Sequence, residues 1–183
     1  VKEGQVLVKI YASSINPFDI KFSEGIVPEV KLPITLGSDF AGVVSEVGQG
    51  VADFQVGNKV YGSANALSGA TGAFAEYAAV PEGLLARMPS TVDFNQAAAV
   101  VLTGVSAVEA LLEHIKLKKE QMILIHGGAG GIGTIAIQLA KYLGAYVATT
   151  ASNEGLEYVK KLGADQIIDY KNQNFQEVLS DYD

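Results

Sequence analysis

The spacing of apolar positions divides the chain into two parts with different periods. In the first part, Val6, Val8 and Ile10 recur at every second position, and short runs at 43–47, 59–61 and 74–80 are each followed by Gly or Pro. Alternation of this kind is typical of β-strands, because successive side chains point to opposite faces. Short strands at this spacing predict a compact, β-barrel-like domain.

The second part has the longer period of helices. Asp93 followed by Gln96 is typical of a capping pair at the start of a helix. Beyond this pair, apolar residues recur at helical spacing and predict a helix that buries one face in the core. The residues of this predicted face are Val105, Val108, Leu111, Leu112 and Ile115.

Short strands alternate with helices in the rest of the chain. The expected strands are 122–126, 145–150 and 166–169, and the expected helices end at Gly144 and Leu162. This order is that of the first half of a Rossmann fold, a doubly wound parallel sheet. We therefore predict a β domain over residues 1–92 and the α/β Rossmann domain over 93–183.

These elements account for only the first half of a dinucleotide-binding sheet. In a complete sheet a fourth strand pairs with the first, so the strand at 122–125 would be an open edge in the isolated chain. Such an edge favours aggregation or pairing with another chain. We expect the isolated 183 residues to be poorly soluble and nearly inactive, and the functional unit to be larger.

Composition narrows the functional classes. A net charge of −7 without a basic cluster argues against a nucleic-acid partner, because that affinity depends on clustered Lys and Arg. The chain has no cysteine, which excludes disulfides, a thiolate nucleophile and a cysteine-bearing zinc site. No apolar run approaches the ~20 residues that span a bilayer. We expect a soluble, cytoplasmic protein with no membrane partner.

The clearest chemical motif is a glycine-rich loop between an apolar strand and an amphipathic helix. Gly128, Gly130 and Gly133 have the spacing of a dinucleotide-binding loop. Gly128 would permit a sharp turn where a Cβ would clash, Gly130 the approach of a pyrophosphate and Gly133 the close packing of the helix on the sheet. The N–H groups near Gly131 and Ile132 would face the phosphates. The alternative is a tight turn that binds no ligand.

The tip of the second Rossmann strand distinguishes NADPH from NADH. Proteins that prefer NAD carry an Asp or Glu there, about 20 residues after the loop, to bind the ribose hydroxyls. Residues 149–153 contain no carboxylate, and Ser152 could donate a hydrogen bond to a 2′-phosphate. We interpret Glu154 as a partner of the helix dipole. The pattern favours NADPH.

Five segments, in order along the chain, resemble the quinone oxidoreductase branch of the zinc-independent medium-chain dehydrogenases/reductases. They are Ser-Ile-Asn-Pro-Phe-Asp at 14–19, Leu-Gly-Ser-Asp-Phe-Ala-Gly-Val-Val at 36–44, Gly-Ala-Phe-Ala-Glu-Tyr at 72–77, Leu-Thr-Gly at 102–104 and His-Gly-Gly-Ala-Gly-Gly-Ile-Gly at 126–133. The resemblance implies a GroES-like β-barrel domain that carries catalytic and substrate residues, followed by the Rossmann domain. It also implies a homodimer of the full-length protein.

The resemblance implies an activity as well: hydride transfer from NADPH to a quinone or an α,β-unsaturated carbonyl. Asn16 would line the nicotinamide and its ribose, and Thr103 would contact the nicotinamide. Lys21 would stabilise a developing enolate or hold the ribose, although it could equally be an ordinary solvated lysine. Tyr170 matches a family residue near the 2′-phosphate, and Lys171 beside it could supply charge.

Two departures from the family pattern change these expectations. Gly155 stands where quinone reductases often carry a phosphate-binding lysine, so we expect only a modest preference for NADPH. Asn16 and Ser38 stand where zinc-dependent members bind metal through Cys and His, and amide and hydroxyl groups are poor zinc ligands. We expect no metal site, and interpret Asp39 as a turn or capping carboxylate. The alternatives are a metal-assisted alcohol dehydrogenase and a non-catalytic NADPH-binding redox sensor or structural protein.

Overall fold

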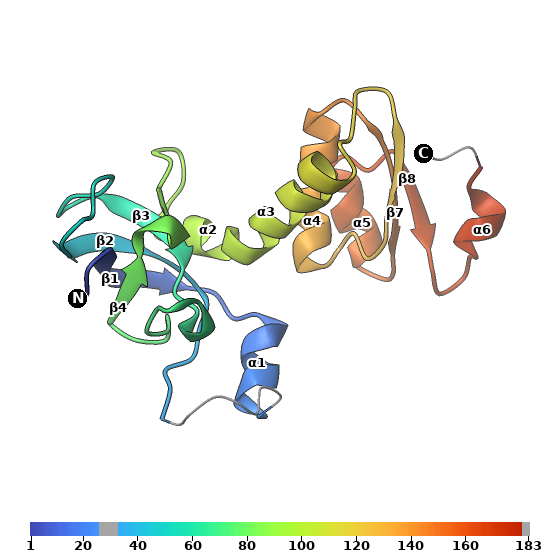
Figure 1. The fold of residues 1–183 in the computed structure, drawn as a ribbon. Coiled ribbons are helices and arrows are strands. Elements are labelled where there is room, and N and C mark those ends of the chain that lie inside the picture. The colour runs from blue at the N-terminus through green and yellow to red at the C-terminus, as the bar shows by residue number, and fades with distance from the viewer. Residues whose placement is uncertain (26–32, 181–183) are drawn as a thin grey trace. The chain divides into compact units, whose positions relative to one another are not determined.

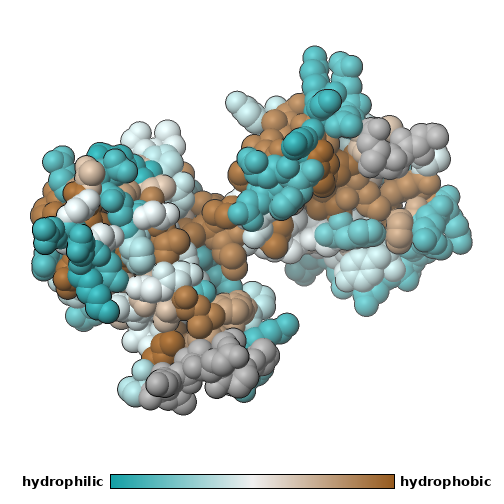
Figure 2. Space-filling model, viewed as in Figure 1, coloured by the Kyte–Doolittle hydropathy of each residue, from teal (hydrophilic) through white to brown (hydrophobic). Residues whose placement is uncertain are grey.

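The structure is a computed structural model that describes residues 1–25 and 33–180 (Figure 1). Its contacts divide the chain into two compact units, Val1–Leu102 and Thr103–Asp183. The first unit contains an antiparallel sheet and the second a parallel sheet with helices, as the two periods in the sequence predicted. Hydrophilic and hydrophobic residues are interspersed on the visible surface of each unit (Figure 2).

The boundary between the units falls after Leu102, later than the predicted boundary after residue 92. The residues in between include helix α2 (Phe94–Ala99), which packs on the strands of the first unit. The start of this helix is confirmed. The Asp93 carboxylate accepts from the N–H of Gln96 at 2.8 Å, and Gln96 Oε1 accepts from the N–H of Asp93 at 3.1 Å. The capping pair therefore begins a helix of the first unit, not of the second.

A five-stranded antiparallel sheet forms the framework of the first unit, in the order β4-β1-β2-β3-β5. The strands are β1 (Gln5–Ser13), β2 (Asp39–Val47), β3 (Lys59–Ser63), β4 (Tyr77–Pro81) and β5 (Leu85–Arg87), and the short helices are α1 (Pro17–Ser23), η1 (Ala66–Ser68) and η2 (Glu82–Leu84). Three of the predicted strand regions lie within β1, β2 and β3. The fourth, 74–80, overlaps β4, which begins only at Tyr77. Phe40 and Val44 lie in the core between these elements and are almost completely buried.

Three parallel strands form the sheet of the second unit, in the order β6-β7-β8. Its elements are α3 (Val101–Val108, which begins in the first unit), η3 (Glu109–His114), β6 (Met122–Ile125), α4 (Gly131–Tyr142), β7 (Tyr146–Ala151), α5 (Gly155–Lys161), β8 (Gln166–Asp169) and α6 (Phe175–Val178). This alternation confirms the predicted first half of a Rossmann sheet. Within the described residues β6 is an edge strand, and no helix there is long and apolar enough to cross a bilayer.

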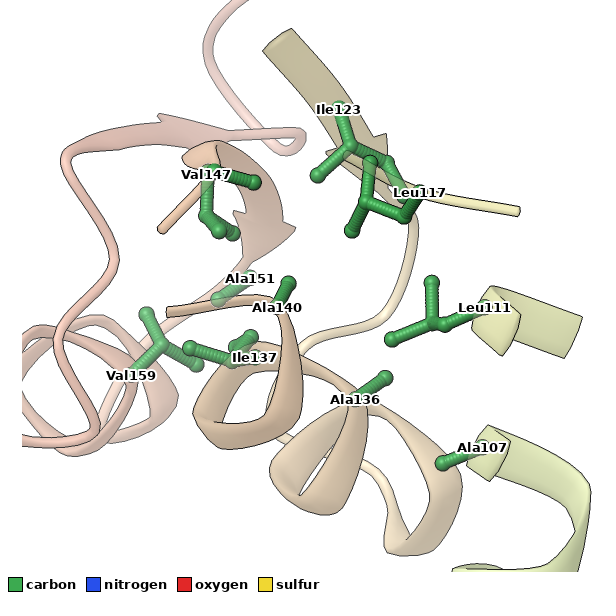
Figure 3. Close-up of a cluster of buried hydrophobic side chains, with 11 residues drawn as sticks. Ala107, Leu111, Leu117, Ile123, Ala136, Ile137, Ala140, Val147, Ala151 and Val159 are labelled. Atoms are coloured by element: carbon green, nitrogen blue, oxygen red, sulfur yellow. The ribbon is translucent and has the colours of Figure 1, made fainter. Parts of the chain in front are cut away.

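Figure 3 shows the core of the second unit, where Ile137 of α4 lies with Val147 of β7 and Val159 of α5. All three side chains are fully buried. The same helix carries the small buried residues Ala136 and Ala140, which leave room for another helix to approach closely. Helix α4 therefore packs on the sheet with one face and against α3 and η3, which precede β6, with another.

This preceding segment buries a different face from the predicted one. Ala107 and Leu111 point towards α4 and are buried (Figure 3). In contrast, Val105, Val108 and Ile115 are 54%, 41% and 56% exposed. Ala107 and Leu111 lie four residues apart and fit against the small residues of α4. In addition, α3 passes into the π-helical η3, which changes the angular spacing of the side chains. The predicted core face is therefore wrong except at Leu111.

Candidate functional site

A glycine-rich loop links β6 to α4 at the end of the parallel sheet. The N–H of Gly127 donates to Thr150 Oγ1 at 2.9 Å, and the N–H of Gly128 donates to the carbonyl oxygen of Thr150 at 3.0 Å. A further bond joins the N–H of Gly130 to the carbonyl oxygen of Gly127 at 2.9 Å. The loop is therefore anchored to strand β7 by its own backbone.

The first glycine of the predicted motif is needed for packing and not for turning. The sharp turn lies one residue earlier, at Gly127, whose φ of +67° favours glycine. At Gly128 an added Cβ would collide with Thr149 Oγ1 and would lie 2.8 Å from Ile137 Cδ1. Gly128 thus lets the loop fit between β7 and α4. The predicted clash of a Cβ at this residue is confirmed, whereas the turn itself is made by Gly127.

The last glycine of the motif lets α4 begin close to the loop itself, whereas the sequence had predicted close packing of the helix on the sheet. An added Cβ on Gly133 would collide with the carbonyl oxygen of Gly127. At Gly130 and Gly131 the protein's own atoms leave more room for a side chain. An added Cβ would lie 3.2 Å from Gly127 O and 3.1 Å from Thr103 Cγ2, respectively. The missing side chains at these two positions leave the surface in front of the helix bare.

The start of α4 carries backbone N–H groups that have no acceptor within the helix. The N–H of Thr134 donates to the carbonyl oxygen of Gly130 at 2.9 Å, the first bond of the regular helical pattern. The N–H groups of Gly131, Ile132 and Gly133 precede it, and Gly130 provides no side-chain cap. These groups and the positive end of the helix dipole are suited to binding an anion such as a phosphate.

The ends of β7 and β8 bring three of the predicted residues together. Ser152 Oγ donates to Tyr170 Oη at 3.0 Å, and the N–H of Tyr170 donates to the carbonyl oxygen of Ala151 at 3.2 Å. Lys171 Nζ lies 5.5 Å from the centre of the Tyr170 ring, in a cation–π contact. Two hydroxyl groups and one ammonium group gather at this edge of the sheet, a combination that can bind a phosphate dianion.

A carboxylate that the sequence gave no reason to consider lies beside this group. Asp169 is the last residue of β8, and its oxygens accept from the N–H of Lys171 at 3.1 Å and from Asn172 Nδ2 at 2.7 Å. Its backbone N–H donates to Gln173 Oε1 at 3.0 Å. The Asp169 carboxylate is thus engaged in holding the turn after β8, which carries Tyr170 and Lys171.

Gly155, at the start of α5, lies against the glycine loop. An added Cβ there would lie 2.9 Å from Ala129 Cβ, closer than two such atoms normally approach. A lysine at this position would push the loop or the helix away. The packing therefore gives a physical reason for glycine at a position where quinone reductases often carry a lysine, and it leaves Lys171 as the cation of this region.

In the first unit, four polar side chains form a buried cluster. Asn16, Asp19, Ser38 and Asp39 are 7%, 4%, 7% and 1% exposed. Asp19 Oδ2 accepts from the N–H of Asn16 at 2.8 Å, and Asp19 Oδ1 accepts from Ser38 Oγ at 3.5 Å. Asn16 Nδ2 donates to Asp39 Oδ2 at 2.8 Å. The sequence pointed to Asn16 and Ser38 but not to the carboxylates that hold them. Asp39 is 23 residues from Asn16, whereas Asp19 follows Asn16 at the spacing of a capping box and could have been found from it.

Asp39 acts as a capping carboxylate, as interpreted, for a helix distant in the chain, because Leu102 lies in the first turn of α3. It opens strand β2, and its Oδ2 also accepts from Ser14 Oγ at 3.0 Å and from the N–H of Leu102 at 3.3 Å. Burial raises the pKa of the Asp39 carboxyl above its usual value, the hydrogen bonds from Asn16, Ser14 and Leu102 oppose the rise, and the charge of Asp19 adds to it. The carboxylate is a buried acceptor for donors from separate segments.

Lys21 and Thr103 lie on helices of different units. Lys21 is in the last turn of α1, where it is exposed and forms no ion pair with the residues that the structure describes. Thr103 is on α3, and its Cγ2 lies 3.1 Å from the position that a Cβ on Gly131 would take. Thr103 therefore lies beside the glycine loop. Lys21 lies on α1, and Asn16 is the residue that immediately precedes this helix.

Two family models match the parts of the chain described above. Residues 2–90 match the alcohol dehydrogenase GroES-like domain, and residues 131–182 match the zinc-binding dehydrogenase model. The crystal structure of Escherichia coli quinone oxidoreductase complexed with NADPH superimposes on 97% of this chain and 54% of that one, with a TM-score of 0.86 and 32% identity. The chain belongs to the quinone oxidoreductase branch of the medium-chain dehydrogenase/reductase family.

This member of the medium-chain dehydrogenase/reductase family is also similar to two plant proteins. It is 43% identical to the chloroplastic NADPH-dependent alkenal/one oxidoreductase of Arabidopsis thaliana and 42% identical to the 2-methylene-furan-3-one reductase of Solanum lycopersicum, in each case over 100% of the chain and 49% of the relative. The chain therefore spans about half the length of the curated relatives it matches. The predicted combination of a GroES-like domain and a Rossmann sheet is confirmed.

The family model that matches the second unit is named for zinc binding, so we compared the side chains of this protein with the ligands that zinc requires. Among the described residues, no group of three or more His, Asp or Glu side chains could hold a metal ion. Asn16 and Ser38, which the family resemblance matches to zinc-ligand positions, carry an amide and a hydroxyl, and both are poor zinc ligands. Both groups donate hydrogen bonds to buried carboxylates.

Proposed function

We propose that the second unit of this reductase binds NADPH and that the whole protein transfers hydride to a quinone or an α,β-unsaturated carbonyl compound. The observation that carries the proposal is the bare start of α4, where backbone N–H groups precede the first helical hydrogen bond. The relatives named for NADPH-dependent alkenal/one reduction and for quinone reduction support it. In this scheme the first unit supplies residues on the substrate side.

The two phosphate-bearing parts of NADPH would bind at different places on the second unit. The pyrophosphate would accept hydrogen bonds from the N–H groups at the start of α4, with Gly130 leaving room for it. The 2′-phosphate would be bound by the hydroxyls of Ser152 and Tyr170 and the ammonium group of Lys171. These three side chains already contact one another, so binding would require little further ordering.

The nicotinamide end would be held by residues that the family resemblance names. When bound, the nicotinamide of NADPH supplies the hydride. Asn16 and Thr103 would hold the ring and its ribose, and Lys21 would place positive charge near the carbonyl oxygen, where negative charge develops as the β-carbon accepts hydride. Because a lysine ammonium group can provide this stabilisation, we propose that the reaction is independent of zinc.

The experiment that tests this function follows the absorbance of NADPH in the presence of the full-length protein. Cyclohex-2-enone and cyclohexanone form a matched pair of substrates, because only the enone has a β-carbon that can accept hydride. We expect oxidation of NADPH with the enone and with quinones, but not with the ketone, and no loss of rate after treatment with a chelator. NADPH binding without turnover would favour a redox sensor, and metal-dependent oxidation of simple alcohols would favour an alcohol dehydrogenase.

Replacing Lys21 by Met is expected to lower kcat for enone reduction about tenfold and to leave the melting temperature nearly unchanged. The developing enolate loses a nearby cation, whereas an exposed lysine contributes little to stability. Lys2→Met removes another exposed lysine of the same unit and should change neither quantity. Identical steady-state kinetics of Lys21→Met and the parent would show that Lys21 is an ordinary solvated lysine.

A further inference from the structure

The carboxylate of Asp39 joins two segments that are implicated in nicotinamide binding. Its Oδ2 accepts from Asn16 Nδ2 at 2.8 Å and from the N–H of Leu102 at 3.3 Å. Asn16 is the proposed nicotinamide residue of the first unit, and Leu102 immediately precedes Thr103 in the sequence. One carboxylate oxygen therefore fixes the side chain of Asn16 and the backbone next to Thr103.

Asp39 also determines the direction of the Asn16 amide. An ionised carboxylate can only accept hydrogen bonds, so the Nδ2 group of Asn16 must face it and Oδ1 must turn away. The backbone N–H of Asn16 is held separately by Asp19 Oδ2 at 2.8 Å. With its backbone and its amide both restrained, Asn16 presents Oδ1 as an acceptor in one orientation.

Ser14 and burial keep the Asp39 carboxylate itself in place. Ser14 Oγ donates to Asp39 Oδ2 at 3.0 Å, and the N–H of Ser14 donates to the backbone carbonyl of Asp39 at 3.3 Å. Asp39 is 1% exposed, so water does not compete for these bonds. A fully paired buried network restricts its members to one arrangement. A substitution at Asp39 should therefore alter the orientation of the Asn16 amide without altering the surface of the protein.

We propose that Asp39 is a positioning residue for hydride transfer, which acts through the Asn16 amide and the backbone N–H of Leu102. Asp39 does not touch the reacting atoms; it fixes the groups that hold the nicotinamide. The inference rests on the proposed NADPH-dependent function. Its consequence is selective, because loss of the carboxylate disturbs the nicotinamide end of the cofactor and leaves the adenosine end, bound by the second unit, unaffected.

Asp39→Asn in the full-length protein tests this role. Asparagine keeps the size of the side chain and one acceptor oxygen, but it removes the negative charge that strengthens the three hydrogen bonds to Oδ2. We expect the dissociation constant for NADPH to rise about tenfold, with a similar fall in kcat. Adenosine 2′,5′-bisphosphate, which lacks the nicotinamide, should bind as it does to the parent. Calorimetry measures both constants without turnover, and equal weakening of both ligands, or of neither, would overturn the proposal.

A double-mutant cycle with Asn16→Ala separates positioning from general destabilisation. If Asp39 acts mainly through Asn16, Asp39→Asn should lower kcat about tenfold in the parent but less than about twofold in the Asn16→Ala background. Additive losses would contradict the proposal. Asp53→Asn, which neutralises an exposed aspartate of the same unit, is the control and should leave kcat and both binding constants unchanged.

Two further outcomes have a defined meaning. If Asp39→Asn does not fold, Ser14→Ala removes one donor to the same carboxylate and should weaken NADPH binding selectively, by a smaller factor; equal binding of both ligands to Ser14→Ala and to the parent would then overturn the proposal. A parent protein that binds NADPH but reduces no quinone or enone would refute the proposed function alone, since the two binding constants still decide the positioning role.

Discussion

Replacing Ser152 by Asp is expected to weaken NADPH binding by about a hundredfold. Ser152 Oγ donates to Tyr170 Oη at 3.0 Å, and Lys171 contacts the ring of the same tyrosine. An aspartate at this position removes the hydroxyl and places a negative charge beside a 2′-phosphate that already carries close to two charges. NADH lacks that phosphate and should bind at least as well as it does to the parent. The measurement is the ratio of the two dissociation constants.

Two variants control for charge and for the hydroxyl separately. Ser68→Asp adds the same charge at an exposed position of the first unit and should leave the ratio unchanged. Ser152→Ala removes only the hydroxyl and should weaken NADPH binding about tenfold. Tighter binding of NADH than of NADPH by the parent, or unaltered NADPH affinity of Ser152→Asp, would mean that the end of β7 does not face the 2′-phosphate.

Gly133→Ala is expected to weaken NADPH binding on the order of a hundredfold and to lower the free energy of unfolding by about 1–3 kcal/mol. The added Cβ would collide with the carbonyl oxygen of Gly127, which is backbone and cannot rotate away like a side chain. The loop must therefore shift, and the N–H groups at the start of α4 lose their alignment. Urea unfolding and an NADPH titration of the same preparation give both quantities.

Gly83→Ala is the matched control for this substitution. An added Cβ there meets no atom within 4 Å, so stability and NADPH binding should both stay close to those of the parent. Gly131→Ala separates the two effects, because its Cβ meets only the Thr103 methyl group, at 3.1 Å, while it fills the surface in front of the helix. If Gly133→Ala binds NADPH as the parent does, the contact between the loop and α4 does not control the phosphate site.

The features that the sequence predicted well are those whose hydrogen bonds or steric contacts join residues only a few positions apart in the chain. Asp93 and Gln96 lie three residues apart and cap each other at 2.8 and 3.1 Å. The glycine loop was predicted from its place between a strand and a helix, and Gly133 lets the helix begin close to this loop. Within the same loop, however, the sequence could not tell that Gly127, and not Gly128, makes the turn.

The buried face of α3 and η3 could not be predicted from periodicity. Val105 and Val108 have helical spacing and high hydrophobicity, and so do Ala107 and Leu111, so the pattern contains two apolar faces. The choice between them depends on α4, whose small residues accept the second pair, and on the π-helical geometry of η3. A residue's neighbours in space decide burial, and they come from a segment that lies later in the chain.

By itself, the sequence determined the order of strands and helices, the glycine loop and the absence of a carboxylate at the tip of β7, because each is a property of adjacent residues. Only the tertiary structure decided the partners of Asp39. Its carboxylate accepts from Asn16, 23 residues before it, and from Leu102, 63 residues after it. A hydrogen bond forms between groups within about 3 Å of each other, and the sheet register and the packing of α2 bring these groups to that distance.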